Sequence, residues 1–203
     1  MIHTVDPTLP QALAFLAWLA LAVGFVLRPR SASGAGARRD VRSRLGLAVQ
    51  AVAFGLGFAL HRPFEQHPGV VESVACWAGV VLAWGSVWLA VASVRALGRQ
   101  WSLDARVVEG HRLVREGPYA FVRHPIYAAM LGLCLGTGLN LMPWAAIPPA
   151  VVVYLAGTHL RTRAEEGLLL RQFGEEYVRY AAEVPALLPW RFGRRSPPAT
   201  GGG

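Results

Sequence analysis

Imidazole, phenol and guanidinium groups gather within residues 111–127, immediately before an apolar stretch that could enter a membrane. The segment includes Tyr119, Arg123, His124 and Tyr127. Taken singly, tyrosine and arginine at a membrane interface are common anchors. An anchor does not require all of these groups in so short a segment, and we therefore interpret 111–127 as a candidate site for chemistry.

Two prolines and a glycine predict the local structure of this segment. Gly117 and Pro118 predict a turn, because proline fixes its own φ angle and disfavours helix in the residue before it. Pro125 suits the first position of a helix, with His124 as the cap residue. The N-terminal end of such a helix presents backbone N–H groups that can bind a carboxylate or a phosphate.

A second group of charged residues, 161–166, follows the last apolar stretch. Thr162 and Glu165 have the spacing of a capping box, which predicts the start of a new helix. If one helix instead continues through this point, Arg161 and Glu165 lie on the same face at i,i+4. The sequence leaves both interpretations open, and the second one brings opposite charges close to the first cluster.

The composition is that of an integral membrane protein. Of 203 residues, 54% are hydrophobic and 16% are charged, and the mean hydropathy is +0.37, which is too apolar for an ordinary soluble domain. A helix that spans a bilayer needs about 20 apolar residues. Five stretches reach or approach this length: Leu9–Leu27, Leu45–Leu60, Ser73–Val94, Ile126–Leu141 and Trp144–Leu160.

The predicted fold is an all-α, polytopic transmembrane helical bundle of about five spans. Only Met142 and Pro143 separate the last two stretches, which predicts a tight helical hairpin for spans 4 and 5. A four-span alternative would make that pair re-entrant. Between residues 164 and 182, apolar residues recur at helical spacing opposite charged ones, which predicts a cytoplasmic amphipathic helix.

The arginine distribution predicts the orientation of the bundle. All 20 basic residues are arginine: six lie in residues 28–44, six in 95–125 and seven in 161–195, and only Arg62 lies elsewhere. Cytoplasmic loops collect positive charge, so we expect the N-terminus outside and the C-terminus in the cytoplasm. The first residues lack the positive charge of a signal peptide, and we expect no cleaved leader. The arginine, alanine and glycine bias indicates a GC-rich genome, so we expect a bacterial inner (plasma) membrane.

These features divide the chain into three parts. Residues 1–94 hold three N-terminal spans and an arginine-rich cytoplasmic loop. Residues 95–192 form the catalytic region, with a cofactor-binding loop, spans 4 and 5 and the C-terminal amphipathic helix. Residues 193–203 have no apolar face to bury and predict a disordered tail. Cys76 and Cys134 lie in predicted spans, and we assign them neither a disulfide nor a metal.

Over residues 95–190 the chain resembles the isoprenylcysteine carboxyl methyltransferase family, which belongs to a wider group that includes membrane phospholipid methyltransferases. Several motifs occur in the same order. They are His111–Val114, Gly117, Tyr119, Arg123-His124-Pro125, Tyr127, Arg161, Glu165-Glu166, 173–177, Tyr180, Val184-Pro185 and Leu188-Pro189. The resemblance implies methyl transfer from S-adenosyl-L-methionine to a lipophilic acceptor, with a carboxylate such as that of an isoprenylcysteine-like compound as the expected acceptor.

The resemblance also implies a set of site residues. The cofactor-binding positions are His111, Arg112, Leu113, Val114, Tyr119, His124, Pro125, Ile126, Tyr127 and Glu165. Arg161 is similar to the family's acceptor-side arginine, and we assign it the catalytic role. Asp104 departs from the family pattern, because it stands where a polar amide is expected. The expected partners are a lipophilic or lipidated acceptor and membrane lipid, with no nucleic acid and no metal.

The identity of the acceptor sets the chemistry that the site must provide. A carboxylate is already ionised at neutral pH, so its methylation requires alignment and water exclusion more than a general base. An amine or a thiol would first lose a proton, and His124 or Glu166 would then be the candidate base. The sequence does not choose among these acceptors.

Two other functions are compatible with parts of the sequence. Membrane sterol reductases that use NADPH share similar C-terminal Arg-His-Pro and tyrosine-rich segments, but generally have more spans than this chain can form. A non-catalytic adaptor could use the arginine-rich face to bind anionic lipid. The glutamates among these arginines argue against a purely electrostatic surface.

Overall fold

The computed structural model describes residues 8–27, 41–60, 69–98 and 112–189, and within them every regular element is helical. In chain order the elements are α1 (Thr8–Val26), α2 (Val41–Ala59), α3 (Val70–Leu97), η2 (Gly117–Ala120), α4 (Pro125–Leu141), η3 (Trp144–Ala146), α5 (Ile147–Phe173) and α6 (Glu175–Glu183). The all-α prediction is confirmed.

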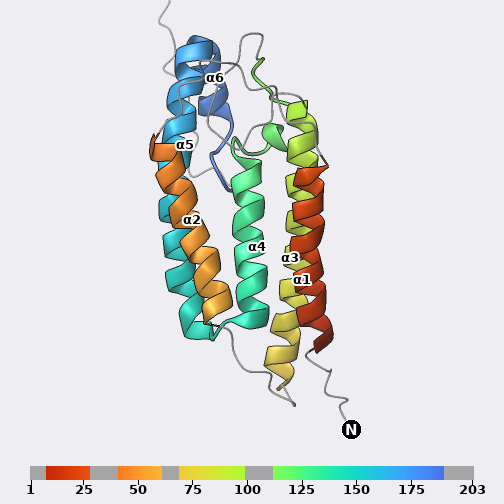
Figure 1. Ribbon diagram of the computed structural model, residues 1–203. Helices are drawn as coiled ribbons and strands as arrows, with labels where there is room; N and C mark the ends of the chain where they lie inside the picture. The colour runs from red at the N-terminus through yellow and green to blue at the C-terminus, as the bar shows by residue number, and fades with distance from the viewer. Residues whose placement is uncertain (1–7, 28–40, 61–68, 99–111, 190–203) are drawn as a thin grey trace, which may run out of the picture.

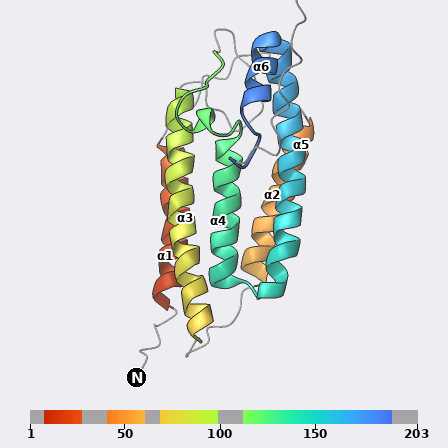
Figure 2. The ribbon, with the colours of Figure 1, turned by 180° about the vertical axis from the view of Figure 1, so that it is seen from behind.

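Helices α1 to α5 lie side by side as a bundle in which consecutive helices run in opposite directions (Figure 1). Helix α4 lies between the α1 and α3 pair and the α2 and α5 pair, as both views show (Figure 2). The most extensive packing joins α3 to α4 and α2 to α5. Helix α6 and η2 lie at the end of the bundle where α4 begins, so this end collects the residues of both polar clusters.

Glycines allow the most closely packed helix pairs to approach backbone to backbone. A Cβ atom on Gly46 of α2 would lie 2.6 Å from the carbonyl oxygen of Gly157 on α5. A Cβ atom on Gly79 of α3 would lie 2.8 Å from the carbonyl oxygen of Gly136 on α4. Small residues at helix crossings are characteristic of membrane bundles, where close packing replaces the hydrophobic driving force. These contacts fix the positions of α4 and α5 relative to the rest of the bundle.

Hydrogen bonds donated by buried or partly buried side chains link the helices further. The Trp18 indole on α1 donates to Thr137 Oγ1 on α4 at 2.9 Å, and Gln50 Nε2 on α2 donates to Thr158 Oγ1 on α5 at 2.8 Å. The Tyr154 hydroxyl on α5 donates to the carbonyl oxygen of Tyr127 on α4 at 2.9 Å. Because a buried polar group must find a partner, these bonds favour one register of the helices.

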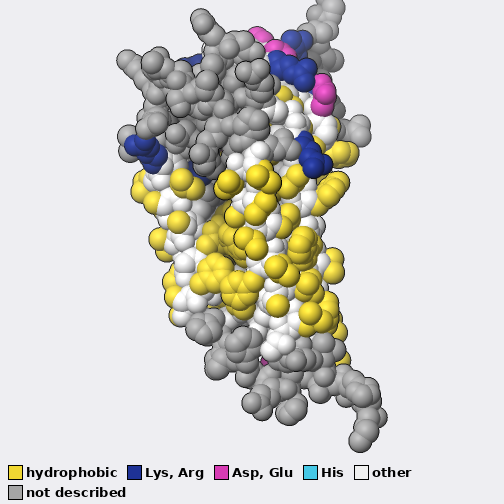
Figure 3. All heavy atoms as spheres, turned by 45° about the vertical axis from the view of Figure 1, so that its right-hand side comes forward, with side chains coloured by type: hydrophobic (Ala, Val, Ile, Leu, Met, Phe, Trp, Pro, Cys, Tyr) yellow, Lys and Arg dark blue, Asp and Glu magenta, His cyan; other side chains and the backbone are white. Residues whose placement is uncertain are grey.

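Each of the five predicted apolar stretches forms a helix, and α4 and α5 form the predicted hairpin. By length and apolar composition, two of the helices in the described part of the chain are candidate membrane spans, α1 and α3. Helix α4 is apolar but shorter. The outward faces carry large apolar side chains, among them Val81 and Trp88, and a space-filling view shows such side chains over the middle of one face (Figure 3).

The prediction of a single amphipathic helix over residues 164–182 is wrong. Helix α5 continues without a break to Phe173, and α6 starts separately at Glu175. The break falls at Gly174, whose φ of 52° lies in the left-handed region that favours glycine. The predicted apolar face is nevertheless correct for α6, because Tyr177 and Tyr180 are buried.

Candidate binding site at the junction of helices α4 and α5

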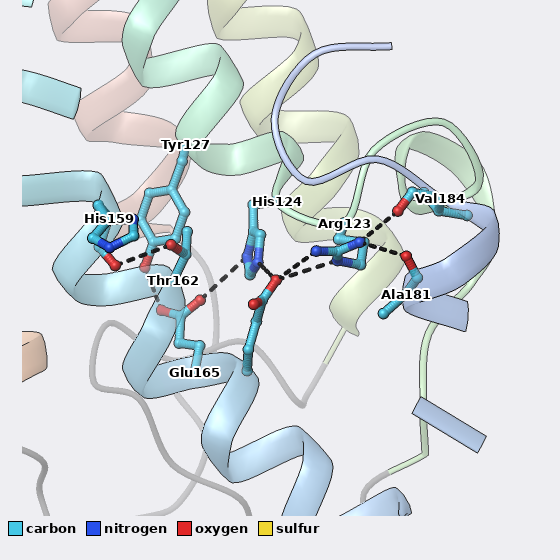
Figure 4. A network of polar contacts seen from close by, with 9 residues as sticks. Arg123, His124, Tyr127, His159, Thr162, Glu165, Ala181 and Val184 are labelled. Carbon is cyan, nitrogen blue, oxygen red and sulfur yellow. Dashed lines mark hydrogen bonds and ion pairs between the residues drawn. The ribbon is translucent and has the colours of Figure 1, made fainter. Parts of the chain in front are cut away.

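The two polar clusters of the sequence meet where α4 begins and α5 passes residue 160. The Tyr127 hydroxyl on α4 donates a hydrogen bond to the carboxylate of Glu165 on α5. The Arg161 guanidinium carbon lies 5.2 Å from the centroid of the Tyr127 ring, within the range of a cation–π contact. Figure 4 shows Tyr127 and Glu165 pointing toward each other from the two helices.

The structure decides between the two interpretations of residues 161–166. Because α5 runs unbroken from Ile147 to Phe173, no helix begins at Thr162, and the capping-box interpretation is wrong. Thr162 Oγ1 instead donates to the carbonyl oxygen of His159 at 3.2 Å. Arg161 and Glu165 lie on the face of α5 that meets α4, as the i,i+4 interpretation predicted.

His124 is buried between two carboxylates. Its Nε2 donates to Glu166 Oε1 at 3.1 Å, and its Nδ1 lies 3.6 Å from Glu165 Oε2. Burial alone would lower the pKa of His124, but the hydrogen bonds and negative charges of Glu165 and Glu166 outweigh it and raise the pKa above its ordinary value. His124 occupies the predicted cap position before Pro125, although its side chain makes no capping hydrogen bond.

One carboxylate oxygen of Glu166 accepts several hydrogen bonds. Arg123 donates to Glu166 Oε1 from Nη2 at 2.8 Å and from Nε at 3.2 Å, in addition to the bond from His124. The hydrogen bond from His124 favours the ionised form of Glu166, and so do the hydrogen bonds and the charge of Arg123. They outweigh the opposite effect of burial and lower the pKa of Glu166 to about 2. Glu166 is therefore ionised at neutral pH.

Residues 181–186, which we call the strap, lie against the N-terminal end of α4. Arg123 Nη1 donates to the carbonyl oxygens of Ala181 at 2.8 Å and Val184 at 2.7 Å. The backbone N–H groups of Arg123 and His124 donate to Pro185 and Ala186 carbonyls at 2.8 and 2.9 Å. The strap thus uses the N–H group of His124, the cap residue of α4, together with that of Arg123 before it.

Helix η2 borders the same region. Its first residue, Gly117, has a φ of 59°, so the predicted turn at Gly117 and Pro118 is confirmed. Tyr119 is buried, and the Tyr180 hydroxyl on α6 donates to its carbonyl oxygen at 2.7 Å. Burial, together with the nearby negative charge of Glu165, raises the pKa of Tyr119 far above its ordinary range. Burial likewise raises the pKa of Tyr180 to about 12.

The predicted cofactor positions are brought together only in part. Tyr119, His124, Tyr127 and Glu165 share one neighbourhood through the contacts above. Pro125 and Val114 are buried, and Leu113 and Ile126 are half-buried. The side chain of Arg112 is 70% exposed and lies 4.0 Å from Glu116, so it does not point into the cluster. His111 and Asp104 lie outside the described residues.

Arg123 is the residue whose role the sequence did not reveal. Its presence in an Arg-His-Pro motif marked the position, but two of its partners are backbone carbonyls far along the chain. Every residue type has a backbone carbonyl, so the sequence does not show which carbonyls accept a hydrogen bond from a side chain. Its carboxylate partner, Glu166, was considered only as a candidate base.

The cluster combines two arginines and a histidine with two carboxylates. Arg123, Arg161 and His124 lie beside Glu165 and Glu166. In the described part of the chain, no group of three or more His, Cys, Asp or Glu side chains is arranged to hold a metal ion.

Comparison with known proteins shows the family to which this chain belongs. The phospholipid methyltransferase family profile matches residues 74–176, which is half of the chain and contains all of α4 and α5, including Arg123, His124, Tyr127, Arg161, Glu165 and Glu166. The chain belongs to this family.

Individual relatives agree with the resemblance seen in the motifs. The chain is 40% identical over 89 residues to protein-S-isoprenylcysteine O-methyltransferase B of Arabidopsis thaliana, which covers 43% of this chain and 45% of the relative. It is 38% identical over 81 residues to the protein-S-isoprenylcysteine O-methyltransferase of Homo sapiens, covering 39% of this chain and 28% of the relative. The match thus spans less than half of each of these relatives. The predicted membership in the isoprenylcysteine carboxyl methyltransferase family is confirmed.

Proposed function

We propose that the protein is a membrane methyltransferase that transfers a methyl group from S-adenosyl-L-methionine to the carboxylate of a lipophilic acceptor, such as an isoprenylcysteine-like compound. The observation that carries the proposal is the meeting of Tyr127, Glu165 and Arg161 at one point between α4 and α5. Relatives named isoprenylcysteine O-methyltransferases support the same reaction class.

The residues around Glu165 suit the cofactor. Its carboxylate side chain is 26% exposed, so ligand donors such as amino or hydroxyl groups can reach it. The Tyr127 ring lies 5.8 Å from the His124 ring, and the face of a tyrosine ring attracts a positively charged group. The bound cofactor supplies an electrophilic methyl group. We assign its binding to Tyr119, His124, Pro125, Ile126, Tyr127 and Glu165, together with 111–114.

Arg161 is our candidate for holding the acceptor. Its guanidinium is buried beside Tyr127, where a charge-assisted bond to a carboxylate would be strong. The role of the chain is then to align the acceptor oxygen and to exclude water, which are the main requirements for attack by an ionised oxygen.

The titration of the cluster supports a carboxylate acceptor over a thiol or an amine. A general base must be unprotonated at neutral pH and still basic enough to take a proton. Glu166, with a pKa of about 2, is a weak base, and the raised pKa of His124 favours its protonated form. An acceptor that arrives ionised needs neither of them.

We further propose that all five helices α1 to α5 cross a bacterial inner membrane, with the N-terminus outside and the C-terminus in the cytoplasm. The exposed apolar side chains of α1, α3 and α5 support membrane burial. Figure 3 shows arginine and acidic side chains gathered near one end of the molecule. The cofactor would then reach the site from the cytoplasm, while the acceptor tail stays among the spans. Residues 95–192 form the catalytic region in this proposal.

The proposal is tested by methyl transfer with the purified protein in detergent or lipid. Labelled S-adenosyl-L-methionine is offered with a matched panel of lipophilic carboxylates, thiols and amines, including an S-prenylated N-acetylcysteine. We expect label only in the carboxylates. Transfer confined to thiols or amines would overturn the acceptor class. Thermal stabilisation by NADPH, without stabilisation by S-adenosylhomocysteine, would favour a reductase instead.

A further inference from the structure

We propose that Glu166 is a positioning residue that fastens the strap (residues 181–186) to the N-terminal end of α4 and thereby orients the cofactor-binding side chains. This inference rests on the proposed function only where it concerns the cofactor. The fastening itself is a property of the fold.

Glu166 binds Arg123, and Arg123 in turn binds the strap. Arg123 directs Nη2 and Nε at Glu166 Oε1 and directs Nη1 at two strap carbonyls, Ala181 and Val184. Figure 4 shows Arg123 reaching Ala181 and Val184. The guanidinium therefore has its orientation fixed from both sides, and its side chain is only 15% exposed.

The two carbonyls that Arg123 binds need a donor. Ala181 lies in the last turn of α6, and Val184 is its C-cap residue. Carbonyl groups at the C-terminal end of a helix lack intrahelical partners, and a cation placed there is favourable. Arg123 therefore supplies the α6 cap from another part of the chain, and Glu166 keeps this cap in place.

The same oxygen of Glu166 extends the link into the candidate binding set. Glu166 Oε1 accepts from His124 Nε2, and the opposite nitrogen of that ring faces Glu165. Glu165 in turn accepts from Tyr127. The strap is thus connected through Arg123 and Glu166 to His124. From His124 the connection continues to Glu165, whose carboxylate we propose binds the cofactor.

This assignment separates the roles of two adjacent glutamates. Glu165 contacts Tyr127 and His124, both in the proposed binding set. Glu166 instead bonds to Arg123, which lies outside that set, and its His124 bond orients the ring from the side away from Glu165. We therefore assign cofactor binding to Glu165 and positioning to Glu166.

The first test measures the fastening without any ligand. Hydrogen exchange of the Arg123 and His124 amides reports on their bonds to Pro185 and Ala186. We expect Glu166→Gln to accelerate this exchange at least about tenfold, because the neutral amide holds Arg123 less firmly. Glu176→Gln is the matched control: it removes a carboxylate that pairs with Arg115 near the same end of the bundle. Its exchange at residues 123 and 124 should equal that of the wild type.

The second test asks whether the loss of Glu166 also impairs cofactor binding by the proposed binding residues. In Glu166→Gln we expect the KM for S-adenosyl-L-methionine to rise about tenfold, while kcat at saturating cofactor stays within about threefold of the wild type. A double variant, Arg123→Gln with Glu166→Gln, should be little worse than either single variant, because both changes break one link.

The outcomes distinguish the inference from the proposed function. Unchanged exchange at residues 123 and 124 in Glu166→Gln overturns the fastening, whatever the kinetics show. A loss of kcat without a change in KM overturns the positioning role. If the wild type transfers no methyl group, the proposed function fails, and the exchange result alone still decides the fastening. If Glu166→Gln does not fold, Arg123→Lys must show the same accelerated exchange, because the single nitrogen of lysine cannot occupy the separate Nε, Nη1 and Nη2 positions from which arginine binds Glu166 and the two carbonyls.

Discussion

Arg161 and Tyr127 face each other across the contact of α5 and α4, with the guanidinium carbon 5.2 Å from the centroid of the ring. The two residues are separated by the whole hairpin in sequence. Their contact places a buried cation next to the hydroxyl that binds Glu165. The proposed acceptor group and the proposed cofactor group are therefore neighbours, which is the arrangement that transfer between two bound molecules requires.

We predict that Arg161→Ala lowers methyl transfer about 10- to 100-fold, while S-adenosylhomocysteine still binds with wild-type affinity. The magnitude follows from the loss of a charge-assisted bond of about 1.5–3 kcal/mol. Calorimetry for the cofactor product and initial rates for the acceptor measure the two effects separately. Arg163→Ala is the matched control, because Arg163 is exposed on the same helix. Wild-type turnover in Arg161→Ala would remove the acceptor role.

Glu165→Ala should have the opposite pattern and weaken cofactor binding. The variant removes both the acceptor of the Tyr127 hydroxyl and one carboxylate next to His124. We expect the Kd of S-adenosylhomocysteine to rise about tenfold or more, since a bond to a charged group contributes about 1.5–3 kcal/mol. Glu175→Ala, at an exposed position of α6, should bind as the wild type does. Unchanged affinity in Glu165→Ala would assign the cofactor to other residues.

Thermal stability should depend on pH through His124 and Glu166. The raised pKa of His124 means that its contribution to stability is complete below about pH 6.5 and is lost as the pH rises through its folded value. The lowered pKa of Glu166 means that its contribution to stability is complete above about pH 4.5 and is lost as the pH falls toward 2. We therefore expect a stability maximum between these limits.

The variant His124→Gln identifies the alkaline side of this profile. It should flatten the decline of the apparent Tm above pH 6.5 and leave the acidic decline in place. The exposed His159, on the outer side of α5, provides the control, and His159→Gln should keep the wild-type profile. An alkaline decline of wild-type size in His124→Gln would show that another group causes it.

The sequence predicted the helices well, because runs of apolar residues, the proline that begins α4 and the proline between α4 and α5 determine where they lie. It predicted the cap position of His124 and the turn at Gly117 for the same local reason. It failed at Gly174, because the apolar spacing continues across the glycine that ends α5. It missed the link from Arg123 to the strap, since that link depends on backbone carbonyls that only the folded chain brings within reach.

The orientation in the membrane can be measured with single cysteines in a Cys76→Ala, Cys134→Ala background. The arginine distribution predicts that Ser33→Cys is labelled only after the membrane is permeabilised, and that Gln66→Cys is labelled by an impermeant maleimide in intact cells. The two sites control for each other within one experiment. Labelling of both from outside would contradict the proposed topology.

Finally, α2 and α5 approach each other closely at Gly46, so a larger residue at this position should affect both stability and methyl transfer. A Cβ atom at this position would lie 2.6 Å from Arg161 Cγ and 2.6 Å from the Gly157 carbonyl oxygen. Gly46→Ala must therefore move either the helix or the Arg161 side chain. Overpacking of this kind costs about 1–3 kcal/mol, which corresponds to a fall of about 3–10 °C in the apparent Tm.

Because one of the displaced groups is Arg161, we expect Gly46→Ala also to reduce methyl transfer more than it reduces cofactor binding. Gly55→Ala is the matched control on the same helix, since a Cβ atom there would meet nothing within 4 Å. This control should be neutral or slightly stabilising, because alanine is the better helix former. If Gly46→Ala lowered stability but left transfer at the wild-type rate, the position of Arg161 would not matter for the acceptor.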